Sequence, residues 1–179
     1  RLMTAFLSGQ VDAKFPDNPA WRTEARAGQP IHYSDPVLTY IDGVSVRPEN
    51  KPASADAVHL LGTLTGFTPF PWDSRVRAGK TRFAESPNVE ALIRQALQGR
   101  VDGVYANVAV VNYQLDNALR QPGALRFGPA LPHARDYYHL SSIRMPALIE
   151  EFNRWQSQNR SRIAALKARH AVEKGVPPL

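Results

Sequence analysis

The sequence has no cysteine among its 179 residues. Disulfide bonds, thiolate metal sites and cysteine nucleophiles are therefore excluded, and the redox compartment stays open. The sequence also lacks an apolar run long enough to span a bilayer, which excludes an integral membrane segment. With 43% hydrophobic and 21% charged residues, its composition is ordinary for a globular chain of one large domain or two small lobes.

Several catalytic and cofactor motifs are also missing. The five histidines do not have the i, i+4 spacing with a third partner that a metal site needs. Gly62 and Gly66 are not followed by the Gly-Lys-Ser/Thr sequence of a phosphate loop, and no Gly-x-Ser-x-Gly nucleophile elbow occurs. We therefore expect no enzyme activity, no metal site and no cofactor.

The formal net charge is +6 and is spread along the chain. The densest basic stretch lies near the C-terminus, and a solvated helix face explains it better than a nucleic-acid patch, which would have interleaved aromatic residues. We therefore expect no nucleic-acid partner, and only a weak overall preference for anionic ligands. The basic residues of this stretch are Arg154, Arg160, Arg162, Lys167, Arg169 and Lys174.

One phrase of the sequence occurs twice. Residues 2–13 (LMTAFLSGQVDA) return as residues 92–103 (LIRQALQGRVDG). Each copy predicts an apolar helix end, a glycine stop and a Val-Asp pair that opens a short strand. The repeat indicates two similarly built α/β units, and Asp17 and Asn107 follow the two strands at equivalent positions. Ligands of such units collect beyond the carboxyl ends of the strands.

The hydrophobic pattern predicts short strands that alternate with helices, which is typical of an α/β fold with a largely parallel sheet. Ser86 is the predicted N-cap of a helix with Pro87 at its first position. We expect strands at residues 11–15, 31–33, 38–46, 59–64, 81–84, 101–105, 125–127 and 138–142, and helices at 1–8, 86–97, 108–115, from 146 onward and at 160–173.

Residues 47–54 have the composition of a linker. We therefore predict lobe 1 at residues 1–47, lobe 2 at 48–130, and a crossover strand with C-terminal helices at 131–179. Because the chain begins inside a helix, we expect the amino-terminal part of lobe 1 to lie outside this sequence.

Four segments carry a resemblance to a known family: residues 7–13; Thr23-Glu24-Ala25-Arg26 with Tyr33-Ser34-Asp35-Pro36; residues 62–68; and residues 99–103 with the Phe152-Asn153 helix. In order and spacing they resemble the type II periplasmic substrate-binding proteins, in particular the amino-acid-binding solute-binding family 3. The resemblance implies two lobes, each with a mostly parallel central sheet flanked by helices, and a ligand cleft between them. It also implies a monomer in the periplasm, its signal peptide removed, that delivers a small carboxylated solute to the permease of an ABC importer.

The resemblance also assigns ligand-binding residues. Arg26 stands where the family clamps the ligand's carboxylate, and Phe67 and Thr68, after Gly66, stand where backbone N–H groups and a hydroxyl grip the same anion. Family members that bind α-amino acids usually have a carboxylate at the position of Asn107. Asp17, its counterpart in the first repeat, is our candidate to supply that charge.

Each of these residues also has a structural interpretation. Arg26 alternatively forms a surface ion pair with Glu24 or Asp35, and Asn107 alternatively caps the helix that follows it. For Asp12 and Asp102, which open the repeated strands, we expect structural hydrogen bonds rather than catalysis. The full set of candidate ligand-binding residues is Asp17, Asn18, Arg26, Gly66, Phe67, Thr68, Trp72, Tyr105 and Asn107, with Phe70, Trp72 and Tyr105 as an aromatic floor or as ordinary core.

Two other functions stay open. The same fold serves as a ligand sensor or as an accessory partner of another periplasmic protein. Some proteins of this fold resemble dehydratases of cyclic carboxylic acids, which need an acid/base carboxylate, and Asp17 is the candidate for that role.

Overall fold

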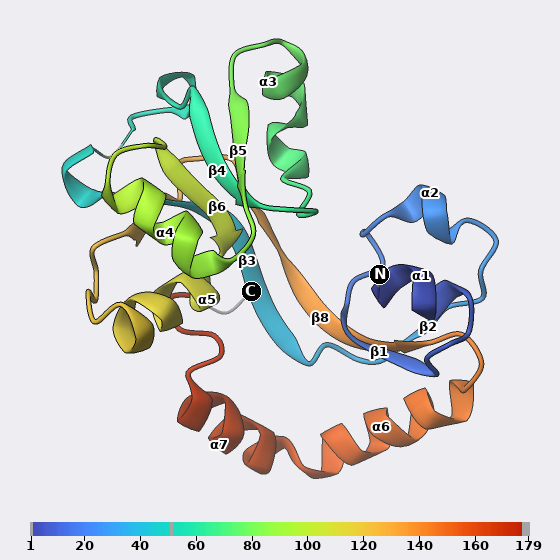
Figure 1. The fold of residues 1–179 in the computed structure, drawn as a ribbon. Helices are drawn as coiled ribbons and strands as arrows, with labels where there is room; N and C mark the ends of the chain where they lie inside the picture. The colour runs from blue at the N-terminus through green and yellow to red at the C-terminus, as the bar shows by residue number, and fades with distance from the viewer. Residues whose placement is uncertain (1, 51, 177–179) are drawn as a thin grey trace. The chain divides into compact units, whose positions relative to one another are not determined.

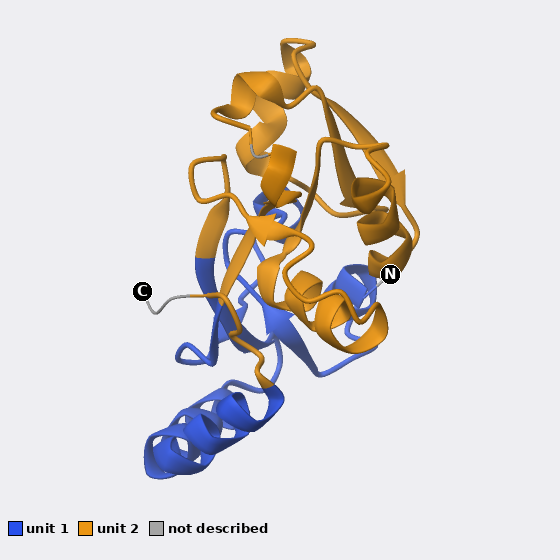
Figure 2. Ribbon diagram, turned by 90° about the vertical axis from the view of Figure 1, so that its left-hand side faces the viewer, with its two compact units in different colours: residues 1–39, 136–170 blue, residues 40–135, 171–179 orange. Residues whose placement is uncertain are grey.

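The computed structural model describes residues 2–50 and 52–176. They form two compact units, which Figure 2 shows in different colours. Unit 1 comprises Arg1–Thr39 and Asp136–His170, and unit 2 comprises Tyr40–Arg135 and Ala171–Leu179. The chain passes from one unit to the other within β3 (Leu38–Val46), near the start of β8 (Ala134–Ser142), and a third time between His170 and Ala171. The lobe boundaries expected from linker composition, at 47/48 and 130/131, stay predictions.

In unit 1, β1 and β2 both pair antiparallel with β8. The parallel strand pairs of the described residues lie in unit 2. The elements of unit 1, visible in Figure 1, are α1 (Leu2–Leu7), β1 (Ala13–Asp17), α2 (Thr23–Arg26), β2 (His32–Tyr33), α6 (Pro146–Gln158) and α7 (Arg160–His170).

Four strands of unit 2 lie in the order β3, β6 (Gly103–Asn107), β4 (Leu60–Leu64) and β5 (Arg82–Ser86), and β7 (Arg126–Phe127) pairs with the carboxyl end of β3. Strand β4 pairs parallel with β5 and with β6, while β3 pairs antiparallel with β6. The other elements are α3 (Asp73–Arg77), α4 (Val89–Leu97), α5 (Val108–Tyr113), β7 (Arg126–Phe127), short 3-10 turns at Pro48–Asn50, Ala55–Ala57 and Phe70–Trp72, and a π-helical turn at Gln114–Ala118.

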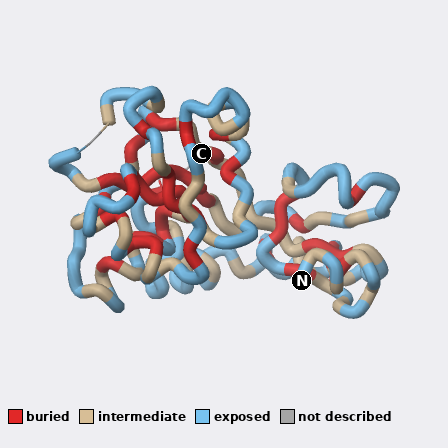
Figure 3. The backbone as a smooth tube through the Cα atoms, turned by 45° about the horizontal axis from the view of Figure 1, so that its top comes forward, coloured by how far each residue is buried: buried red, intermediate tan, exposed pale blue. Residues whose placement is uncertain are grey.

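The core of unit 2 lies on both faces of this sheet. Successive strand residues alternate between the faces, so Val104 and Ala106 pack under α4 while Tyr105 points the other way. Leu92 and Ile93, on the apolar face of α4, are fully buried. Figure 3 shows the buried stretches of the backbone.

The repeated phrase gives the same local structure twice. In unit 1, α1 ends before Gly9, whose φ is 73°, and β1 follows. In unit 2, α4 ends before Gly99, whose φ is 71°, and β6 follows. Both glycine stops are thus confirmed, since these positive φ angles favour glycine. Asp17 and Asn107 are the last residues of their strands.

One helix start differs from the sequence expectation. The N-cap of α4 is Asn88, whose side chain accepts a hydrogen bond from the N–H of Ala91 at 2.9 Å. Ser86 is instead the last residue of β5 and is fully buried, with its hydroxyl accepting from Gln95 Nε2 at 2.9 Å. The prediction of Ser86 as the cap was wrong because two capping residues stand two positions apart, and β-pairing with β4 takes the first of them.

Candidate functional site

Two of the candidate ligand-binding residues, Asp17 and Arg26, bind each other within unit 1. Arg26 Nη2 lies 2.5 Å from Asp17 Oδ1, and Nη1 lies 3.2 Å from Oδ2. Asp17 is 0% exposed and Arg26 6% exposed. The pair therefore has the two-point geometry in which a planar guanidinium meets a carboxylate. Arg26 does form an ion pair, but Asp17 is the partner, in place of the surface residues Glu24 and Asp35.

Three further groups complete this buried cluster. Lys14 Nζ donates to Asp17 Oδ1 at 2.5 Å and lies 5.3 Å from the centre of the Trp21 ring. The hydroxyl of Ser141, on β8, donates to Asp17 Oδ2 at 2.5 Å. Arg26 Nη1 also donates to the Tyr33 hydroxyl at 2.5 Å. Lys14, Tyr33 and Ser141 were absent from the sequence-based candidates.

The cluster shifts the titration of its members. Burial by itself would raise the pKa of Asp17, but hydrogen bonds from Arg26, Lys14 and Ser141 bring it below its ordinary value. Burial also lowers the pKa of Lys14, and the bond to Asp17 offsets part of this effect. Asp17 is therefore a stable anion, which does not suit a carboxyl group that must exchange a proton in acid/base catalysis.

The charges of this cluster do not cancel. Lys14 and Arg26 face the one carboxylate of Asp17, so one formal positive charge is left in a buried place. Arg26 Nε is buried and has no hydrogen-bond partner. Lys14 has three N–H donors and uses one of them on Asp17. The cluster can therefore offer donors and a positive charge to an additional anion.

The neighbouring candidate, Asn18, holds the loop after β1 in place. Its Nδ2 donates to Asp136 Oδ2 and to the carbonyl oxygen of Tyr137, both at 2.9 Å. Its Oδ1 accepts from the N–H of Ala20 at 2.8 Å. Because the amide is buried and bonded at both ends, Asn18 contributes to the position of Asp17, one residue earlier. Direct contact of Asn18 with a ligand stays a prediction.

In unit 2, the chain turns sharply after β4. Gly66 has a φ of 79°, and the N–H of Phe67 donates to the carbonyl oxygen of Leu64 at 2.9 Å, which closes the turn. The Phe67 N–H is therefore already bonded, whereas Thr68 is exposed. The next helical turn is a 3-10 turn at Phe70–Trp72, and Pro69 and Pro71 beside it have no N–H to offer a ligand.

The aromatic candidates divide between core and surface. Trp72 and Tyr105 are fully buried in one core cluster, and Trp72 Nε1 donates to the carbonyl oxygen of Pro132 at 3.0 Å. The ring of Phe67 packs against Tyr105 with 6.1 Å between the centroids. Phe70, in contrast, is 51% exposed. Two of the three proposed floor residues thus pack as core, and their contact with a ligand stays a prediction.

Asn107 has the capping role that we considered for it. Its Oδ1 accepts from the N–H of Val110 at 3.1 Å, at the start of α5. Its side chain also hydrogen-bonds Asp42, which stands directly opposite on β3. Asp42 is 6% exposed, and burial raises its pKa from 3.8 to about 7. The sequence signal for Asp42 is a lone carboxylate within the β-forming run of residues 40–46.

The two aspartates that open the repeated strands make structural hydrogen bonds, as expected. Asp102 Oδ2 accepts from the N–H groups of His59 and Leu60, at 2.7 and 2.8 Å. Asp12 Oδ1 accepts from Arg144 Nη2 at 2.9 Å. Among residues 2–50 and 52–176, no three acidic or histidine side chains gather as a metal site, and no helix is long and apolar enough to cross a membrane.

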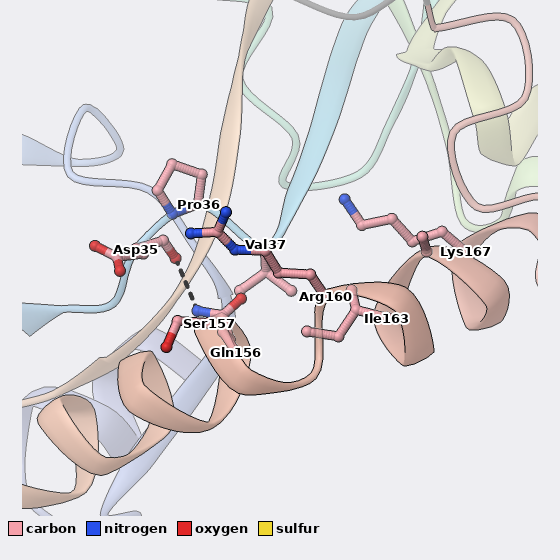
Figure 4. Close-up of a pocket in the computed structure, with 9 residues that line it drawn as sticks. Asp35, Pro36, Val37, Gln156, Ser157, Arg160, Ile163 and Lys167 are labelled. Atoms are coloured by element: carbon pink, nitrogen blue, oxygen red, sulfur yellow. Dashed lines mark hydrogen bonds between the residues drawn. The ribbon is translucent and has the colours of Figure 1, made fainter.

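Each unit also has a surface pocket. The pocket of unit 1, about 320 Å³, lies between the segment after β2 and the helices α6 and α7, and Gln156 donates to the carbonyl oxygen of Asp35 at its edge (Figure 4). The pocket of unit 2, about 530 Å³, is lined by Thr65, Asn88 and Glu90 among others. None of the candidate ligand-binding residues lines either pocket.

No protein-family model and no curated sequence matches this chain. Solved structures do match it. The solute receptor for L-cysteine of Neisseria gonorrhoeae is 13% identical, with a TM-score of 0.71 over 99% of this chain and 72% of that one. The GluR0 ligand-binding core in complex with L-glutamate is 18% identical, with a TM-score of 0.70 over 93% and 75%.

A third structure is the arginine-, lysine- and histidine-binding protein ArtJ from Geobacillus stearothermophilus. It is 18% identical, with a TM-score of 0.68 over 93% of this chain and 73% of that chain. At such identities the likeness is one of fold, and it agrees with the alternation of strands and helices in the sequence. The chain therefore has the α/β fold of the type II periplasmic amino-acid-binding proteins.

Proposed function

We propose that this chain is an extracytoplasmic solute-binding protein that captures a small polar solute bearing a carboxylate, either an amino acid or an organic acid. The fold supports solute binding, because proteins named as amino-acid binders share it. The solute is delivered to the permease of an ABC importer. No covalent chemistry is required for this function.

The observation that carries the proposal is the surplus positive charge of the cluster around Asp17. A buried cation without a counter-ion is costly. An anion that reaches Lys14 and Arg26 should therefore bind with a more favourable free energy than at an exposed cation. Arg26 is the residue that the sequence resemblance assigned to the ligand's carboxylate. We propose that Arg26 shares this role with Lys14, because Asp17 bonds both terminal nitrogens of the guanidinium.

A thermal-shift experiment tests the proposal. The protein is heated alone and with L-arginine, L-lysine, L-histidine, L-glutamate, L-cysteine and a set of organic acids. A ligand that binds only the folded state raises the melting temperature by mass action. We expect at least one carboxylated compound to do so. If none shifts the melting temperature, the chain does not bind the proposed class of solute.

A matched pair of lysine variants shows whether the surplus charge is used. Lys14→Met removes the charge and leaves the Asp17–Arg26 pair in place, so the shift by the carboxylated ligand should disappear. Lys80→Met removes an exposed charge elsewhere and should leave the shift unchanged. Equal ligand shifts in both variants would contradict a role of the cluster in binding.

A further inference from the structure

We propose that the pocket of unit 1 is a second binding site, for a small organic anion with an acidic group at each end of an apolar chain. This site is separate from the cluster around Asp17 and does not depend on the proposed function. The residues that line it all belong to unit 1 and come from the segment 35–37, from α6 and from α7.

A bend between two helices shapes the pocket. Helix α6 ends at Gln158, and the N–H of Asn159 donates to the carbonyl oxygen of Trp155 at 3.0 Å. The chain bends there, so that side chains of both helices face the segment 35–37 (Figure 4). Gln156 is buried and donates to the carbonyl oxygen of Asp35 at 3.5 Å, which ties this segment to the end of α6.

The side of α7 that faces the pocket has a regular pattern. Arg160, Ile163, Ala164 and Lys167 follow the i, i+3, i+4, i+7 spacing that places residues on one side of a helix. A cation therefore stands at each end of this side, with apolar residues between the two. The proline and valine of the segment 35–37 form the opposite, apolar wall.

The charged groups of the pocket favour an anion. Figure 4 shows Arg160 and Lys167 projecting from α7 toward the segment 35–37, whereas the Asp35 carboxylate points away from both. The ion pairs among the described residues do not include Arg160, and the first turn of α7 has no acidic residue. The guanidinium can therefore offer two parallel N–H bonds to a carboxylate of a ligand.

Lys167 can bind the other acidic group. An ammonium group has three N–H donors, so Lys167 can bind a ligand anion in addition to the contact that it makes within the protein. Along the axis of α7, Arg160 and Lys167 stand about 10 Å apart, which is about two helical turns. One carboxylate is too small to reach both positions on the helix, whereas an extended dicarboxylate spans a similar length.

The space between the two cations suits an apolar chain. Ile163 lies between them on the helix, and Val37 lies on the opposite wall, so CH₂ groups of a ligand would leave water there. The volume of about 320 Å³ is at the lower end of the range for small-ligand pockets. The geometry therefore fits a dicarboxylate of medium chain length.

Isothermal titration calorimetry with suberate, the eight-carbon dicarboxylate, tests this site. We expect suberate to bind wild type with a Kd of about 1 mM or lower. Octanoate, which has one carboxylate, should bind about tenfold or more weakly, and 1,8-octanediol should not bind. If suberate does not bind wild type, the proposal is wrong. If octanoate binds as tightly as suberate, the requirement for two acidic ends is wrong.

Matched variants of α7 locate the binding. Arg160→Gln removes one of the two cations and should weaken suberate about tenfold or more, whereas Arg162→Gln, outside the pocket, should have no effect. Ala164→Glu places a carboxylate between the cations and should abolish binding, whereas Ala165→Glu should not. Both alanines are exposed and glutamate suits a helix, so all four variants should keep the melting temperature of wild type.

Lys14→Met separates this site from the cluster around Asp17. Suberate should bind Lys14→Met and wild type equally. If Lys14→Met weakens suberate and Arg160→Gln does not, suberate binds at the cluster, so the pocket proposal is wrong and the proposed function is supported. If neither variant weakens suberate, the pocket proposal is also wrong. If only Arg160→Gln weakens it, the pocket is a site of its own, whatever the thermal-shift screen finds for the cluster.

Discussion

The guanidinium of Arg26 holds the carboxylate of Asp17 through both of its terminal nitrogens, inside unit 1. Asp17 and Asn107 end the strands that follow the two copies of the repeated phrase, so the two units differ in charge at equivalent strand ends. In unit 1 the strand-end residue is a carboxylate and binds the cations Arg26 and Lys14. In unit 2 the strand-end residue is an amide and hydrogen-bonds the carboxyl group of Asp42.

Removing the carboxylate of the buried pair should destabilise the protein strongly. Asp17→Asn leaves Arg26 and Lys14 without their counter-ion, and breaking a buried pair in this way costs about 3–5 kcal/mol. Urea unfolding measures the loss. Asp12→Asn is the control, because its ion pair with Arg144 is exposed and should cost at most about 1 kcal/mol. Similar losses in the two variants would show that Asp17 does not act as a buried counter-ion.

The stability of the ligand-free protein should decrease as pH rises from about 4 to about 7. Burial raises the pKa of Asp42 from 3.8 to about 7, so over this range the folded state keeps a proton that the unfolded chain has lost. The raised pKa corresponds to about 4 kcal/mol. Urea unfolding across this pH range should show the decrease in wild type and a flatter profile in Asp42→Asn. Parallel profiles would contradict an ionisable, buried Asp42.

The N-cap of α4 should be worth about 1 kcal/mol, because Asn88 satisfies the otherwise unbonded N–H of Ala91. We expect Asn88→Ala to lower the free energy of unfolding by that amount and Asn88→Gly to lower it by only a few tenths of a kcal/mol. Equal losses for alanine and glycine would count against the cap.

The aromatic residues near the turn after β4 should differ in their effect on stability. Trp72→Ala removes a fully buried ring and should cost about 3–5 kcal/mol, whereas Phe70→Ala removes a ring that is 51% exposed and should cost far less. Chemical unfolding of both variants checks this difference. A small loss of unfolding free energy for Trp72→Ala would contradict a core position of this ring and would instead indicate a surface ring on which a ligand could stack.

Much of the fold could be predicted because local signals were repeated or periodic. The two glycine stops and the exact span of β3 both followed from residue type and spacing. Strand starts were less accurate. The strands after the two Val-Asp pairs begin at Ala13 and Gly103, two residues later than predicted, because each aspartate bonds a neighbouring segment before strand pairing begins.

The candidate site was harder to predict because its partners are distant in sequence. The pairing of Asp17 with Ser141 joins residues 124 positions apart, and no local pattern reveals it. Asp42 and Asn107 meet only through the register of β3 with β6. The sequence did single out Asp17, Arg26 and Asn107, but their partners depend on strand pairing.

Calorimetry with an amino acid and its decarboxylated amine tests the central claim most directly, with L-arginine and agmatine or L-lysine and cadaverine as pairs. A surplus buried positive charge should bind the carboxylate, so the amino acid should bind wild type at least tenfold more tightly than the amine, and Lys14→Met should abolish that preference. Equal binding of acid and amine, or a preference that persists in Lys14→Met, would contradict recognition of a carboxylate by this cluster.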